Sequence, residues 1–131
     1  TAIQNPEGFH ADGADMALIQ VEVVDKDGKR CPLDNRTVQF TLNGHAEWRG
    51  GIAQGENNHI LDTNLPVECG INRALIRSTT TAGKVTLTAQ AKGLLSASLT
   101  LETVPVKVTG GLSTYLPQAT LKGRLDRGFR T

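Results

Sequence analysis

The segment from Ala11 to Pro32, ADGADMALIQVEVVDKDGKRCP, limits the possible folds most strongly, because a long alternating stretch lies between two turn motifs. Apolar residues occupy every second position of this stretch, namely Ala17, Ile19, Val21 and Val23. The residues between them include Gln20 and Glu22, a period expected of a β-strand with one buried face. Asp27-Gly28 follows and accepts the positive φ angles of a tight hairpin turn. We therefore predict a strand here, with Leu18 and Val24 as apolar residues on its outer face.

Several other stretches of the chain show the same alternation. Strands are expected at residues 37–43, 71–79, 84–91 and 95–104, with shorter ones at 1–5 and 46–49. Asn5-Pro6-Glu7-Gly8 predicts a turn after the first strand, and Phe9 is expected to anchor the core. No window shows the period of a helix. About seven short strands separated by turn motifs predict an all-β fold, namely an immunoglobulin-like antiparallel β-sandwich.

Composition and side-chain periodicity divide the chain into a predicted sandwich domain at residues 1–108 and a predicted linker or tail at residues 109–131. A length of 131 residues with 38% hydrophobic content suits one domain with a modest core. Residues 50–70 are rich in Gly and Asn and show no sustained period, which predicts a long loop. Long loops in small domains are often functional, so this region is where we expect a site.

The charge balance argues against a nucleic-acid-binding protein, because 14 basic and 13 acidic side chains give a net charge of only +1. The apolar runs are too short for a membrane span. The chain begins TAIQNPEGF, which has neither an initial Met nor the pattern of a signal peptide. We interpret the chain as part of a longer protein, with neither nucleic acid nor membrane as its partner.

Motifs for metal binding or catalysis are weak throughout the chain. Asp25, Asp27 and Gly28 resemble the start of a calcium loop, but the Glu that closes such a loop is missing, so we favour a solvated turn. The His residues at positions 10, 45 and 59 lack the spacing of metal ligands. Neither a carboxylate pair in a cleft nor an activated serine is evident. We therefore predict no cofactor, no metal site and no catalytic residue in this chain.

The candidates for ligand contact lie at and after Trp48. Trp48 beside Arg49 could form a stacking platform for a sugar, but a single Trp in a small sandwich more often fills the core with its N–H bonded, and we favour the core. Asn57, Asn58 and His59 could form hydrogen bonds with a sugar or with a neighbouring domain. The alternative is a polar loop surface that binds nothing.

Cys31 and Cys69 could form a disulfide or remain two thiols. In an immunoglobulin-like order, the strand before Cys31 and the strand after Cys69 are antiparallel neighbours, which brings the two residues near each other. A disulfide would clamp the long loop to the sandwich and indicate an exported protein. Both states remain open from the sequence.

The chain resembles a known domain family over roughly residues 3–104. The most specific motifs are DGAD…VEVVD..G..CP in residues 12–32 and RSTTTAG in residues 77–83. They resemble the immunoglobulin-like C-terminal domain of glycoside hydrolase family 2 enzymes, chiefly β-galactosidases of the Bacteroides type. The resemblance implies a multidomain, exported enzyme whose two catalytic Glu residues lie in a barrel domain outside this chain.

The function that the resemblance implies is that of a non-catalytic accessory domain. Such a domain packs on the other domains of the parent enzyme and could contact an oligosaccharide through residues 49–70. The implied location is periplasmic or extracellular. The alternative is a structural spacer or adhesive immunoglobulin-like repeat of a bacterial surface protein, because invasin-type adhesins share the DG, strand, D..G.P pattern.

Overall fold

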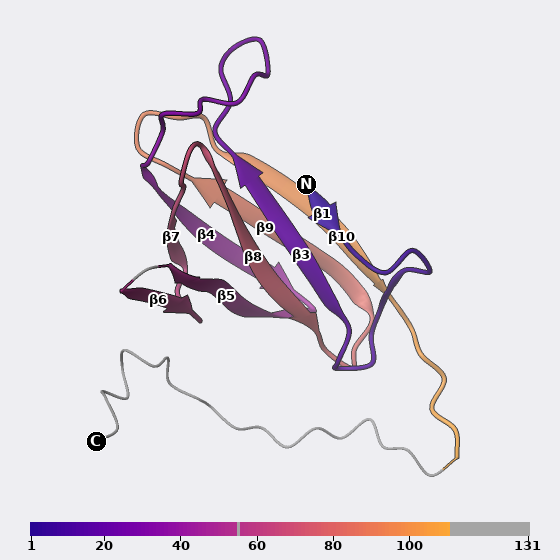
Figure 1. Cartoon of the computed structure of the whole chain (residues 1–131). Coiled ribbons are helices and arrows are strands. Elements are labelled where there is room, and N and C mark those ends of the chain that lie inside the picture. Colours follow the sequence, from indigo (N-terminus) through magenta and orange to yellow (C-terminus); the bar gives the residue numbers. More distant parts are fainter. Residues whose placement is uncertain (55, 111–131) are drawn as a thin grey trace, which may run out of the picture.

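The computed structural model describes residues 1–54 and 56–110, which form two β-sheets (Figure 1). The strands are β1 (Ala2–Ile3), β2 (Phe9–His10), β3 (Met16–Glu22), β4 (Thr37–Gly44), β5 (Ala46–Gln54), β6 (Asn57–Ile60), β7 (Asn64–Pro66), β8 (Ile71–Ser78), β9 (Gly83–Gln90) and β10 (Ala97–Val104). The order is β1-β3-β8-β5-β6 in the first sheet and β2-β10-β9-β4-β7 in the second. The predicted all-β sandwich is confirmed.

The strand count and one pairing differ from the prediction. The described residues contain ten strands rather than about seven, because three short strands at sheet edges, β2, β6 and β7, were not expected from the sequence. The pairing is antiparallel throughout except between β2 and β10, which are parallel. Within these residues no helix has the length and apolarity needed to cross a membrane.

The long strand predicted from the alternating segment is β3, which lies between β1 and β8 in the first sheet. Ala17 lies opposite Ile76 and Ile19 opposite Ala74 in the antiparallel register with β8. All four side chains are buried, since successive residues of a strand point to opposite faces and this set points inward. The first sheet therefore contributes its alternate residues to the core.

The second sheet supplies the other half of the core. Phe9 on β2 is fully buried, so the predicted anchor is confirmed. Val38 and Phe40 from β4 and Val85 and Leu87 from β9 are also buried and belong to the same cluster. One apolar core between two sheets therefore holds the domain together.

Residues 50–70 are not the long loop that the sequence predicts. β5 continues to Gln54, and β6 and β7 follow within this region. Gly50 has a φ of 79°, and Gly51 lies against the Leu65 side chain, so close backbone packing requires both glycines. The register of β5 shifts between Trp48 and Gly50 and again before Ala53. These irregularities break the alternation of side chains, which is why the periodicity did not reveal the strands.

Aspartates build the turns at the two ends of β3. Asp25 Oδ1 accepts hydrogen bonds from two backbone N–H groups of its own turn, at 2.9 and 3.0 Å, so the predicted turn is present. Asp12 Oδ1 accepts two more, at 2.8 and 2.7 Å. Burial raises the pKa of Asp12, but these bonds and one from Ser78 Oγ lower it, and the net pKa lies below its usual value. The strand between the turns is about 23 Å long at 3.3 Å per residue, so the two turns do not form one site.

The predicted linker or tail at residues 109–131 lies outside the described residues from residue 111 onward. The boundary of the sandwich domain near residue 108 therefore stays a prediction, although the last strand, β10, ends before it at Val104.

Candidate functional site

Trp48 on β5 packs against the core, as favoured from the sequence. Its ring centroid lies 5.1 Å from that of Phe40, with 31° between the ring planes. Its Nε1 donates a hydrogen bond to the backbone oxygen of Asp62 at 2.8 Å. A ring face and the polar edge are thus both engaged within the domain, as expected of a Trp that packs on the core. Arg49 beside it is half-buried, and its backbone oxygen accepts the N–H of Leu61 at 3.1 Å.

His59 on β6 is held at the edge of the sandwich by Asp62. The Nδ1 atom of His59 lies 3.0 Å from Asp62 Oδ2, and Asp62 Oδ1 accepts the N–H of Asn64 at 2.9 Å. The His59 side chain is 15% exposed, and its buried Nε2 has no hydrogen-bond partner among the described residues. Leu61 in the intervening turn has a φ of 67°, which is uncommon for a residue other than glycine. The turn between β6 and β7 therefore holds the imidazole in one orientation.

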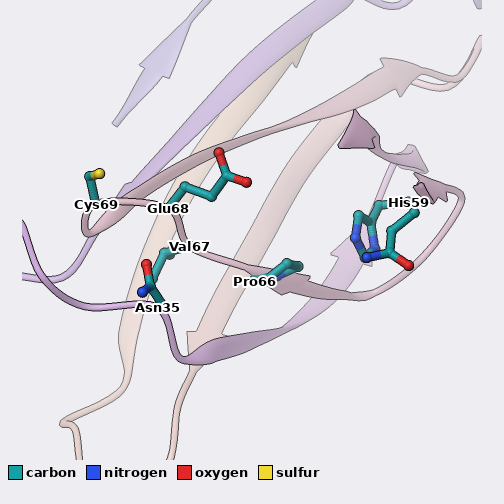
Figure 2. A pocket seen from close by; sticks show the side chains of 7 residues that line it. Asn35, His59, Pro66, Val67, Glu68 and Cys69 are labelled. Atoms are coloured by element: carbon teal, nitrogen blue, oxygen red, sulfur yellow. The ribbon is translucent and has the colours of Figure 1, made fainter. Parts of the chain in front are cut away.

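A groove of about 480 Å³ lies beside His59. Its lining residues come from the loop before β4, from β6, and from β7 and the turn after it: Asn35, Asn57, His59, Pro66, Val67, Glu68 and Cys69. Figure 2 shows their side chains spread from Cys69 at one end to His59 at the other. The groove thus brings together two of the predicted contact residues, Asn57 and His59.

The other predicted contact residues do not line this groove. Trp48 and Arg49 are absent from its walls, and Asn58 Oδ1 accepts the backbone N–H of Ile60 at 3.0 Å. Sequence reasoning missed Asn35 and Glu68, because they join the groove only when β7 pairs with β4 and the chain turns back into β8. The Gly-rich texture of residues 50–70 pointed to the region but not to these two side chains.

The chemistry of the groove suits a neutral polar ligand. The amides of Asn35 and Asn57 can donate and accept hydrogen bonds, and the Glu68 carboxylate accepts them. Pro66 and Val67 add apolar surface. None of the described lining residues is Lys or Arg, so the groove has no permanently charged cation to pair with an anionic ligand.

Cys31 and Cys69 are free thiols in this structure, so the disulfide considered from the sequence is not formed here. The neighbouring strands are arranged as predicted, since Val23 donates to the backbone oxygen of Gly70 at 2.8 Å and Cys31 donates to that of Val23 at 2.8 Å. Cys69 and Gly70 have φ values of 52° and 78°, as in the two-residue turn of a tight hairpin. This turn connects the groove to the start of β8.

A second, shallower groove of about 420 Å³ is lined by residues 31–34. Asp34 in its wall accepts hydrogen bonds from Arg36 Nε at 3.0 and 2.8 Å. These bonds hold the pKa of Asp34 below its usual value. Arg36 Nη1 also donates to the backbone oxygen of Lys92 at 3.0 Å, so this ion pair links the loop to the turn before β10.

Within the described residues, the groove lining does not contain the pair of carboxylates that a glycosidase uses. Glu68 is the only carboxylate in the larger groove, whereas glycosidases use two carboxyl groups that flank the bond to be cleaved. Within the part of the chain that the structure describes, no three His, Cys, Asp or Glu side chains are placed to hold a metal ion. The described lining residues thus offer hydrogen-bonding groups and a single carboxylate.

The chain is similar to a known domain family and to several known proteins. The chain matches the family described as glycoside hydrolase family 2 C-terminal domain 5 over residues 2–100. A β-glucuronidase of Formosa agariphila is 48% identical over 118 residues, which cover 90% of this chain and 12% of that protein. The solved structure of a β-glucuronidase from glycoside hydrolase family 2 matches with a TM-score of 0.81 at 47% identity, over 90% of this chain and 12% of that one. The chain therefore spans only a small part of these relatives.

Two more distant structures share the fold. A family 2 glycosyl hydrolase of Bacteroides cellulosilyticus matches with a TM-score of 0.71 at 28% identity, over 79% of this chain and 14% of that one. Invasin, a bacterial integrin-binding protein, matches with a TM-score of 0.55 at 24% identity, over 80% of this chain and 19% of that one. At this identity, the likeness to invasin shows the fold alone.

Proposed function

The chain belongs to the family of glycoside hydrolase family 2 C-terminal domain 5. Because of this membership, we propose that it is a non-catalytic accessory domain of a longer β-glucuronidase. The observation that supports a glucuronide as the substrate of the parent enzyme is the 48% identity with a β-glucuronidase over 118 residues. The resemblance noted from the sequence implied a β-galactosidase, and we replace that substrate because the two relatives compared above at 48% and 47% identity are β-glucuronidases. The periplasmic or extracellular location stays a proposal that rests on the resemblance to exported enzymes.

The role of this domain in the parent enzyme is to pack against the other domains. Its sandwich has one apolar core, and a groove lies at one edge. We assign the catalytic carboxylates to another part of the parent, which makes up most of such a chain. The adhesive or spacer alternative is supported only by the shared fold with invasin, so family membership outweighs it.

Activity assays on the full-length parent and on this chain test the proposal. The parent should hydrolyse p-nitrophenyl β-D-glucuronide in preference to the β-D-galactoside, and the 131-residue chain alone should hydrolyse neither. A parent that prefers the galactoside would contradict the proposed substrate. Turnover by the isolated chain that disappears in the Glu68→Gln variant would contradict the non-catalytic role.

The groove beside His59 is the part of the domain that suits an oligosaccharide. Its amides, the Glu68 carboxylate and the apolar surface of Val67 match the hydroxyls and C–H faces of a neutral sugar, whereas a uronate would lack a cationic partner. We therefore propose that this groove contacts a neutral sugar unit of a longer substrate. The substrate rim of the parent would then extend onto this domain.

A pair of neighbouring asparagines tests this contact in the full-length parent. Asn57→Ala should raise KM for an oligosaccharide without changing hydrolysis of the nitrophenyl monosaccharide, because only the longer substrate reaches the groove. Asn58→Ala is the matched control, since the Asn58 side chain bonds to its own strand. Equal effects of the two variants on oligosaccharide hydrolysis would refute a role for the groove in substrate contact.

A further inference from the structure

The outer faces of the two sheets differ in chemistry. On the second sheet, the residues that face one another across the central strands β4, β9 and β10 are polar. One row consists of Thr41, Thr88 and Ser98, and the next consists of Asn43, Thr86 and Thr100. Hydroxyl and amide groups of this kind suit contact with water, so this face needs no partner.

The first sheet instead carries a row of apolar side chains from four of its five strands, with Gly50 in the row on β5. Ile3 lies opposite Leu18, Leu18 lies opposite Leu75, and Gly50 lies opposite both Leu75 and Ile60. Leu18 and Leu75 each lie between two buried residues of their own strands, so both point outward. We call Ile3, Leu18, Leu75 and Ile60 the apolar row.

The apolar row is open to solvent in this chain. Ile3 is 57% exposed and Ile60 is 49% exposed, while Leu18 and Leu75 are half-buried. Met16 precedes Leu18 by two residues on β3, points to the same face, and is 38% exposed. Connected apolar surface of this kind marks an interaction site more often than single exposed residues do.

Two arginines beside the apolar row bond to neighbouring side chains of the same sheet. Arg77 forms an ion pair with Glu47 on β5. Arg73 Nε donates to Gln20 Oε1 on β3 at 3.0 Å. Arg77 therefore keeps its counter-charge when a partner covers this face, and Arg73 keeps a neutral hydrogen-bond partner.

We propose that the apolar row packs against the preceding part of the same parent chain, an inference that rests on the proposed function. The matched family is a C-terminal domain, and the matched β-glucuronidase extends far beyond the 12% of its chain that this domain covers. The part of such a chain that precedes this domain enters it at β1, which lies at the edge of the first sheet beside β3 (Figure 1). The amino group of Thr1 donates to the backbone oxygen of Gln20 at 2.9 Å, so the entry point is fixed next to Ile3.

The expected occupant is an apolar patch on the domain that precedes β1. A tethered domain has a high effective concentration at the point where its linker enters, so it occupies the nearest apolar surface in preference to a separate molecule. A second copy of the protein and bulk solvent are the other two possible occupants.

Oxidation of methionine by peroxide in the full-length parent, read by peptide mass spectrometry, tests the proposal. Met16 is the only Met of this chain and lies on the face with the apolar row. Thr86→Met places a reference methionine on the outer face of the second sheet, on the central strand β9. Met16 should oxidise about tenfold more slowly than this reference, because a packed interface excludes solvent. Both rates are normalised to those in denaturant.

Leu75→Lys in the centre of the apolar row should raise the Met16 rate to that of the reference. Amide protection of the β9 peptide in the same variant reports whether the sandwich is still folded. If the variant unfolds, the Met16 rate in the unmodified parent still decides the question. Equal rates for Met16 and the reference would overturn the proposal, and protection that disappears on dilution would overturn it in favour of a second copy. A parent inactive on glucuronides would contradict only the proposed substrate, because oxidation does not depend on turnover.

Discussion

Replacing Gly50 by alanine should destabilise the domain more than the same replacement at a glycine that has a similar conformation but faces open space. Gly50 has a φ of 79°, and a Cβ atom there would lie 2.7 Å from the His59 oxygen and 2.9 Å from the Asp62 nitrogen. The left-handed conformation costs an alanine about 1–2 kcal/mol. Because the nearest atoms are backbone and cannot rotate away, overpacking adds about 1–3 kcal/mol. We therefore expect the free energy of unfolding to fall by about 2–5 kcal/mol for Gly50→Ala.

Gly28→Ala is the matched control for this substitution. Gly28 has a φ of 78°, and a Cβ atom there would meet no atom within 4 Å. The loss of stability in Gly28→Ala should therefore contain only the conformational cost of about 1–2 kcal/mol. The difference between the two variants isolates the contact between β5 and the turn from β6 to β7.

Urea denaturation of the 131-residue chain, followed by Trp48 fluorescence, measures both variants. Trp48 is the only Trp and bonds to Asp62, beside the expected clash, so its emission reports directly on the affected region. We expect a lower midpoint and a red-shifted native emission for Gly50→Ala and an unchanged native emission for Gly28→Ala. Equal losses of stability in the two variants would refute the steric argument and mean that β6 can move away from β5 without cost.

Three further predictions concern other parts of the sandwich. Trp48→Phe should lower stability by about 1–2 kcal/mol, because the backbone oxygen of Asp62 loses its donor, and thermal unfolding followed by circular dichroism measures this loss. Asp12→Ala should cost about 1 kcal/mol at neutral pH. The pKa of Asp12 is lowered in the folded state, so its contribution is present above the ordinary pKa of 3.8 and is lost as the pH falls through the folded value. The difference between this variant and the unmodified chain should therefore shrink as the pH falls below 3.8, and a difference that stays constant on acidification would contradict the assignment. Cys31 and Cys69 should both be alkylated by iodoacetamide without reductant, with the exposed Cys69 reacting first, and a mass without additions would instead indicate a disulfide.

The sequence alone was sufficient for the parts of the fold that depend on local periodicity. β3, β4, β8, β9 and β10 were expected from alternating side chains, and Phe9 was expected in the core. These predictions succeeded because a strand with one buried face must repeat every two residues, whatever its neighbours are. The turns at Asn5 to Gly8 and after Asp25 followed from the backbone preferences of Pro, Gly and Asp.

The short strands of residues 50–70 depended on the tertiary structure. Gly50 and Gly51 looked like loop residues because glycine is common in turns. In the folded domain, they allow β5 to pass close to the turn after β6 and to the Leu65 side chain. A residue that is small because another segment lies against it cannot be distinguished, in a single sequence, from one that is small because the chain must turn.

The candidate site was only half predictable for the same reason. Asn57 and His59 were expected to be available for contact, but the groove also needs Asn35 and Glu68, which are distant from them in the sequence. The sequence by itself determined which strands have an inner face and which family the motifs resemble. The tertiary structure decided which sheet presents an apolar outer face and which polar side chains meet at the groove, because both depend on the order of strands across a sheet, and strand order is set by packing between distant segments.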